Sequence, residues 1–232
     1  MIKRLPVIIV VLLFTTSCGQ VTSPASPIPS ADEPTDAITQ SNALQEETPR
    51  WIETQISDLE VGAWLPPKWQ ADTTNGLTMV EHMGSIHSGQ PSRGITMYIF
   101  VPDIRDLISE LDASDNLAYK VLERVAGSPE HVHGIEIGPP IAFTWGARDA
   151  AYYLYTYGGP DHEQFHGVVL AVTHGREVVA MSVMAPGTES ARIRSAIPQI
   201  LQGMSINKQH LSDAFPDILP DPLIFPDVVE QS

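Results

Sequence analysis

The sequence predicts an α+β domain with the architecture of an α-β-α sandwich, in which helices flank a mostly antiparallel central sheet. Three observations support this prediction. Strand-like segments rich in β-branched and aromatic residues recur through residues 55–206, a few segments between them have the helical period, and the last two strand-like segments are joined by a glycine turn. Packing helices against a sheet is the simplest way to bury the apolar faces of both kinds of element.

The first strand-like segments lie before residue 105. "EVGAWLPPKWQAD" begins with a short strand that Pro66 and Pro67 end, because proline has no N–H to donate to a sheet. Residues 77–84 and 95–104 are rich in β-branched and aromatic residues and predict two more strands, which a polar, glycine-containing connection joins.

The period then changes to that of helices. Residues 105–112 predict a short helix, and residues 114–127 predict a longer one. Ser114 is its predicted N-cap, and Gly127 suits the position just after its last turn. The apolar stripe recurs at i, i+4 and i+8 and consists of Leu117, Val121 and Val125.

Strand character returns at residues 135–145 and 147–158. In the second of these segments the tyrosines alternate, so that one set faces one side of the sheet and Tyr152 and Leu154 face the other. The first set consists of Tyr153, Tyr155 and Tyr157.

The last elements are a hairpin and a helix. Residues 167–174 and 177–186 flank Gly175-Arg176, where glycine allows a tight turn between antiparallel strands. Residues 188–206 have the helical period, with Pro198 expected to kink the helix or to begin its second half. Its apolar stripe consists of Ile193, Ile197, Ile200 and Leu201.

The N-terminal residues predict export and lipid attachment. Residues 1–17 have Lys3 and Arg4 before a ten-residue apolar run, which as a helix would span only about 15 Å and is the length of a secretory signal. Cys18 is the only cysteine and lies where cleavage should occur, as in the lipobox of bacterial lipoproteins, although Thr15 stands where leucine is usual. An ordinary signal peptide with an incidental thiol is the alternative.

Two further segments flank the domain. Residues 18–50 are rich in Ser, Thr, Pro and acidic residues and predict a disordered tether with a mean reach of about 30 Å. Residues 51–206 form the predicted domain. The tail, residues 207–232, is acidic and proline-rich, so it is either disordered or docked on the domain in extended form.

The charge excludes several classes of partner. The formal net charge is −15, and removing residues 1–17 takes away two basic residues and makes it more negative still. Nucleic-acid binding requires a basic surface, and anionic lipid would be repelled, so acyl chains must supply any membrane anchoring. Solubility alone is another explanation for the acidity.

The order of elements resembles the PsbP-like fold, shared by an extrinsic photosystem II subunit, a Ran-binding nuclear import factor and DcrB-type bacterial lipoproteins. The similar segments are "VGAWLPPKW", "LAYKVLERVAG", "GARDAAYYLYTYG", "VVLAVTHGREVVAMSVMAP" and "IPQILQGMSI". Together they cover nearly all of residues 55–206. The resemblance implies the α-β-α sandwich and, for most members, docking on a protein partner. It carries no shared catalytic residues, because fold does not imply function.

One motif points to a different function. His162, Glu163 and His166 match H-E-x-x-H, in which two imidazoles one helical turn apart hold zinc and the glutamate activates a metal-bound water. Here the match follows Gly-Gly-Pro and runs directly into a predicted strand, so no helix of useful length fits. We therefore expect a solvated hairpin loop.

Other candidate sites are weaker. Glu130, His131 and His133 would place two imidazoles on one side of an extended chain, a spacing that suits copper or zinc. Combined with His162 and His166 they could form a surface metal site. The sequence contains no G-x-S-x-G, phosphate loop or Cys-x-x-Cys. Four tryptophans are expected in the core or at its edge rather than in a ligand cage. They are Trp51, Trp64, Trp69 and Trp145.

We therefore expect a non-catalytic, lipid-anchored extracytoplasmic domain that is a binding or accessory module of the cell envelope and needs no cofactor. It would be held on the cell membrane or outer membrane by lipid on Cys18 and face the periplasm or the exterior. Its further partner is an envelope protein or ligand that the sequence does not name. The alternatives are a zinc metallopeptidase acting through His162, Glu163 and His166, and a surface metal-binding protein.

Overall fold

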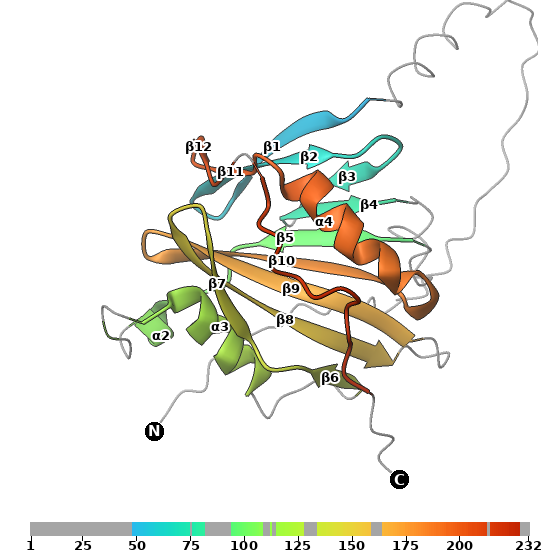
Figure 1. The fold of residues 1–232 in the computed structure, drawn as a ribbon. Helices are drawn as coiled ribbons and strands as arrows, with labels where there is room; N and C mark the ends of the chain where they lie inside the picture. Colours follow the sequence, from blue (N-terminus) through green and yellow to red (C-terminus); the bar gives the residue numbers. More distant parts are fainter. Residues whose placement is uncertain are drawn as a thin grey trace, which may run out of the picture.

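Two antiparallel sheets organise the described part of the chain, which comprises residues 48–74, 76–81, 94–108, 112, 115–127, 134–158, 164–212 and 214–227 of a computed structural model (Figure 1). The larger sheet has the strand order β3-β4-β5-β10-β9-β8-β6, with β7 also paired to β8. Its strands are β3 (Gln70–Asp72), β4 (Leu77–Val80), β5 (Thr96–Phe100), β6 (Ile135–Ile137), β7 (Ile141–Trp145), β8 (Arg148–Gly158), β9 (Gln164–His174) and β10 (Glu177–Pro186).

The smaller sheet has the order β1-β2-β11-β12. It joins β1 (Arg50–Ile56) and β2 (Leu59–Leu65) to the short strands β11 (Ser205–Ile206) and β12 (Gln209–His210) from the far end of the chain. Every pairing in both sheets is antiparallel, and helices pack beside them, so the predicted α+β class is confirmed. The smaller sheet itself is an addition to the predicted single central sheet.

One face of the larger sheet is covered by α3 (Leu117–Ala126), which follows the short α2 (Arg105–Ile108). The predicted alternation of tyrosines is confirmed, because Tyr153 and Tyr155 pack with α3 whereas Tyr152 packs in the core on the opposite face. The N-cap of α3 differs from the prediction. The side chain of Asn116, which accepts a hydrogen bond from the N–H of Tyr119 (2.8 Å), caps the helix, and Ser114 lies outside the described residues.

The opposite face is covered by α4 (Ile193–Leu201), which follows a 3₁₀ turn, η1 (Gly187–Arg192), and by the inner side of the smaller sheet. The predicted apolar stripe of α4 is buried, and the helix continues through Pro198 to its end at Leu201. Ser205 and Ile206, predicted as the end of this helix, instead form β11, because Gly203 takes a positive φ of 66° and turns the chain back toward β2.

The C-terminal residues 214–227, here called the strap, run in extended form over this second face (red in Figure 1). Tyr152 Oη donates to the carbonyl of Ile218 (3.3 Å), and Thr156 Oγ1 donates to that of Pro226 (2.6 Å). Of the two alternatives left by the sequence, the structure shows docking. The apolar residues of the strap that pack on the core are Phe215, Ile218, Leu219, Leu223 and Phe225.

Candidate functional site

The H-E-x-x-H motif ends on a strand. His162 and Glu163 lie outside the described residues, whereas His166 belongs to β9 and pairs with Ala185 and Thr156. Residues 164–166 are therefore extended. In a zinc peptidase this motif lies on a helix, and these residues are not helical.

The side chain of His166 is engaged within the fold. Its ring stacks on Phe225 of the strap with centroids 4.4 Å apart, and its buried Nδ1 has no hydrogen-bond partner. Burial lowers the pKa of this imidazole. This arrangement fits a neutral imidazole that packs against the strap. It does not fit a solvent-exposed imidazole that coordinates a metal ion.

The remaining metal prediction, at Glu130, His131 and His133, lies outside the described residues, as does Cys18. Among the residues that are described, no three His, Cys, Asp or Glu side chains form a group that could hold a metal ion. In the same part of the chain, no helix combines the length and apolarity needed to cross a membrane.

The four tryptophans divide into two pairs. Trp145 is fully buried and Trp69 packs against the core, as predicted. Trp51 and Trp64 lie instead on the smaller sheet, directly opposite one another on β1 and β2, and Trp64 is 37% exposed. The core-edge prediction is therefore incomplete for this second pair, because their rings form part of a surface.

This surface is the outer face of the smaller sheet. Alternate residues of β2 are buried toward the larger sheet, at Leu59, Val61, Ala63 and Leu65, so the residues between them point outward. No described helix or strand covers that side (Figure 1). With the strand register, the outer face consists of Trp51, Glu53, Gln55, Glu60, Gly62, Trp64, Ser205 and His210.

The indole of Trp51 lies across this face, over Gly62. A Cβ placed on Gly62 would lie 2.4 Å from Cζ2 and 2.9 Å from Cε2 of Trp51, which is closer than such atoms approach. Only glycine therefore leaves room for the ring. The indole Nε1–H donates a hydrogen bond to the carboxylate of Glu53 (2.8 Å), which fixes the ring in this orientation.

Two further rings flank Trp51. The Trp64 ring meets it edge to face, with centroids 5.2 Å apart and an interplanar angle of 71°. The His210 ring lies 6.3 Å away at a tilted angle, and its Nδ1–H donates to the carbonyl of Gly203 (2.8 Å). The Trp51 ring, which reaches from the edge strand β1 over β2, is thus in contact with the Trp64 ring of β2 and near the His210 ring of β12.

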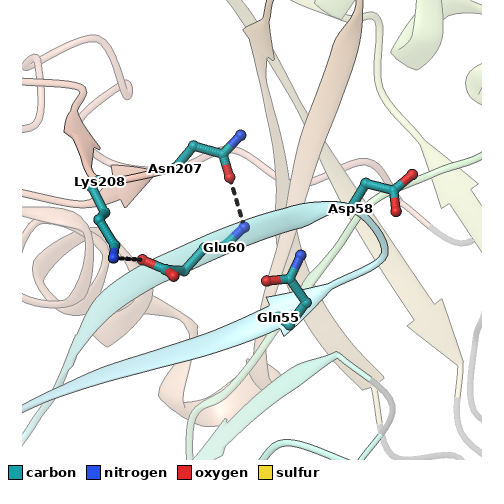
Figure 2. A pocket seen from close by; sticks show the side chains of 5 residues that line it. All are labelled: Gln55, Asp58, Glu60, Asn207 and Lys208. Atoms are coloured by element: carbon teal, nitrogen blue, oxygen red, sulfur yellow. Dashed lines mark hydrogen bonds and ion pairs between the residues drawn. The ribbon is translucent and has the colours of Figure 1, made fainter.

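A shallow polar pocket of about 250 Å³ continues the outer face at the turn ends of the two hairpins (Figure 2). Asn207 Oδ1 accepts the backbone N–H of Glu60 (2.9 Å), and Lys208 Nζ lies 3.8 Å from the Glu60 carboxylate. The side chains of Gln55 and Asp58 complete the lining from the β1–β2 hairpin.

The β11–β12 turn that carries half of this pocket is attached to the larger sheet. Arg148 Nη1 donates to Nδ1 of His174 (3.0 Å), and Nη2 of the same guanidinium donates to Gln209 (3.0 Å). Asn207 Nδ2 lies 3.4 Å from Nε2 of His174. Burial and the Arg148 charge lower the pKa of His174, against the opposing charge of Glu177, so a neutral imidazole fits this linkage.

The sequence contains a signal for the outer face that hydrophobicity alone does not show. On each strand a tryptophan and an acidic residue are separated by an even number of positions and so lie on the same side. These pairs are Trp51 and Glu53 on β1, and Glu60 and Trp64 on β2. A tryptophan that shares a strand face with carboxylates is on the solvent side, since burying those charges would be costly.

No protein-family model matches the sequence, and no curated protein sequence matches it. Solved structures do resemble the fold. The solution structure of cyanobacterial PsbP (CyanoP) from Synechocystis sp. PCC 6803 is 9% identical, with a TM-score of 0.47 over 75% of this chain and 99% of that chain. The fold resembles that of PsbP.

Two other solved structures are similar. LpqN, involved in cell envelope biogenesis of Mycobacterium tuberculosis, is 14% identical, with a TM-score of 0.45 over 73% of this chain and 97% of that chain. PA94 from Pseudomonas aeruginosa, a protein of unknown function described as a putative regulator, is 12% identical, with a TM-score of 0.37 over 63% and 90%. These likenesses concern the fold and carry no argument on function.

Proposed function

We propose that this chain is a non-catalytic, lipid-anchored binding module of the cell envelope, and that the outer face of the smaller sheet is its binding surface. The observation that carries the proposal is the pair formed by Trp51 and Trp64, which lies on a side of the sheet that no described element covers. Tryptophan is among the residues most enriched in the energetic centres of interfaces.

The composition of the outer face also supports binding. Aromatic rings lie at its centre, and polar or charged groups surround them, as in interfaces that have an apolar centre and a polar rim. The rings are held in place by Gly62 and Glu53, so little side-chain freedom is lost when a partner docks.

The anchor is proposed at Cys18, which follows the secretory signal in sequence. The predicted tether leads directly into β1, the strand that carries Trp51. The outer face would thus be presented on the membrane that holds the lipid, toward the periplasm or the exterior. Cys18→Ser should move the protein from the membrane fraction to the soluble fraction, and a variant that stays in membranes through an alkaline wash would contradict the anchor.

Site-specific photo-crosslinking in the native cell tests the binding surface. A photoreactive p-benzoylphenylalanine replaces Gln55, which is exposed at the edge of the outer face and leaves both tryptophans in place. The matched control replaces Ile141, which is 48% exposed on β7 and lies off this face. We expect a discrete adduct from position 55 and none from position 141. Equal adducts from both positions, or none from position 55, would show that the outer face is not the binding surface.

A further inference from the structure

We propose that the outer face binds a cationic group, the guanidinium or ammonium of a basic polypeptide segment, on the Trp51 indole beside the Glu53 carboxylate. This inference rests on the proposed function, since it names the chemistry of the partner that the same surface takes.

The orientation of the rings favours a cation as the bound group. One side of the Trp51 indole lies on β2 at Gly62, so the other side faces away from the sheet. Trp64 stands at 71° to it and is 37% exposed, so part of this aromatic pair is accessible to a partner. A cation within about 6 Å of an indole centroid is attracted by the negative face of the ring, and tryptophan gives the strongest attraction of this kind.

A negative charge at the edge of the indole also favours a cation. Glu53 accepts the hydrogen bond of Trp51 Nε1 at 2.8 Å, which places a carboxylate beside the ring. A cation on the indole would therefore interact with the ring and with a full negative charge a few ångströms away. An arginine is well suited to such a site, because its planar guanidinium stacks on a ring while its N–H groups donate to a carboxylate.

The surroundings of the indole are acidic. Glu53, Asp58 and Glu60 lie on the outer face and its pocket, whereas Lys208 is the cation there and already lies 3.8 Å from Glu60. The whole chain has a formal net charge of −15. This field repels acidic peptides and anionic lipid headgroups and attracts a basic segment.

The test is a titration of the full chain, purified in neutral detergent, with a hexa-arginine peptide in about 0.15 M salt, where the Debye length is about 8 Å and distant charges are screened. We expect saturable binding. Trp51→Leu removes the indole and Glu53→Gln removes the carboxylate without removing the residue that holds the ring. Each change should weaken binding about tenfold, which corresponds to about 1.4 kcal/mol.

Two matched controls separate this site from general attraction to an acidic protein. Asp227→Asn removes one exposed carboxylate from the strap, and Ile141→Ala removes one exposed apolar side chain from β7. Both should change the affinity less than about twofold. A loss from Asp227→Asn as large as that from Glu53→Gln would show bulk attraction only and would overturn the inference. An unchanged denaturation midpoint in Glu53→Gln establishes that the fold is intact.

Other probes distinguish failure of this inference from failure of the proposed function. Hexa-glutamate, anionic vesicles and a neutral oligosaccharide are titrated in parallel. If one of these probes binds, if Trp51→Leu abolishes that binding, and if hexa-arginine does not bind, the cationic partner is refuted and the outer face remains the binding surface. Absence of hexa-arginine binding together with absence of the adduct at position 55 would refute both.

Discussion

Gly62→Ala is the most direct test of the ring arrangement on the outer face. The added Cβ would lie 2.4 Å from Cζ2 of Trp51 and 2.7 Å from Oγ of Ser205. The hydroxyl can rotate to another rotamer, but the indole is rigid and must leave its place on β2. Gly62 does not have a positive φ, so the backbone accepts alanine and the strain comes from the ring alone.

The expected cost follows from two opposing effects. Overpacking of this kind destabilises by about 1–3 kcal/mol, whereas replacing a strand glycine by alanine recovers roughly 0.5–1 kcal/mol of backbone entropy. The net loss lies between about 0 and 2.5 kcal/mol, and its central value of about 1 kcal/mol corresponds to roughly 2–4 °C in Tm for a domain of this size. In a Trp51→Leu background the clash with the ring is absent, so the same Gly62→Ala change should be neutral or slightly stabilising.

Thermal denaturation of the four proteins in this double-mutant cycle measures the coupling, which should be at least 1 kcal/mol. Tryptophan fluorescence provides a second measurement, since Gly62→Ala should shift the emission to longer wavelength as the displaced indole meets water. An equal cost of Gly62→Ala in both backgrounds would mean that the ring does not lie over Gly62. The platform proposed for a cation would then be wrong as well.

Two further predictions concern the strap. Phe225→Ala should destabilise the protein by roughly 1–2 kcal/mol, less than the same substitution of a fully buried phenylalanine, and should speed proteolysis within residues 214–227. The adjacent control Ile224→Ala, at a side chain that is 76% exposed, should do neither, and equal sensitivity of the two variants would contradict the docking of Phe225. The stability should also depend on pH through His166, whose folded-state pKa is lowered by burial, so the folded state favours the neutral ring. Its contribution is present above the unfolded pKa of about 6.5 and is lost as the pH falls through the folded value, because the unfolded chain then binds more protons. His166→Phe keeps a ring against Phe225 and should lose less stability than the parent between pH 7.5 and 5 in urea denaturation, and parallel pH profiles would refute this role.

Much of the larger sheet could be predicted from the sequence because its signals are local. The turn at Gly175 joins strands that are neighbours in sequence, and the structure has the predicted hairpin with a φ of 65° at that glycine. The alternation of tyrosines on β8 and the apolar stripe of α4 also follow from short-range periods. These elements needed no knowledge of distant partners.

The smaller sheet could not be predicted in the same way. Its central pairing brings Ser205 and Ile206 beside Gly62 and Val61, from opposite ends of the domain. A strand of two residues is too short to show a period in the sequence. Because "MSI" follows a strong helical stripe, the apolar pattern predicts that the helix continues through these residues. Only the tertiary contact with β2 makes these residues extended.

The outer face shows why hydrophobicity alone does not assign Trp51 and Trp64 to a surface. Trp64 stands between Ala63 and Leu65, which are 0% and 1% exposed, in a strand whose apolar composition suggests a core position throughout. The pleat of a strand allows only alternate residues to point the same way, so burying Ala63 and Leu65 forces Trp64 outward. Gly62, two residues earlier, then lies on the same side and leaves the space that the Trp51 indole fills. The largest side chain of β2, that of Trp64, therefore lies on the outer side together with Gly62 and Glu60 and contributes little to core packing. Because core packing does not explain this tryptophan, we assign its surface a binding role.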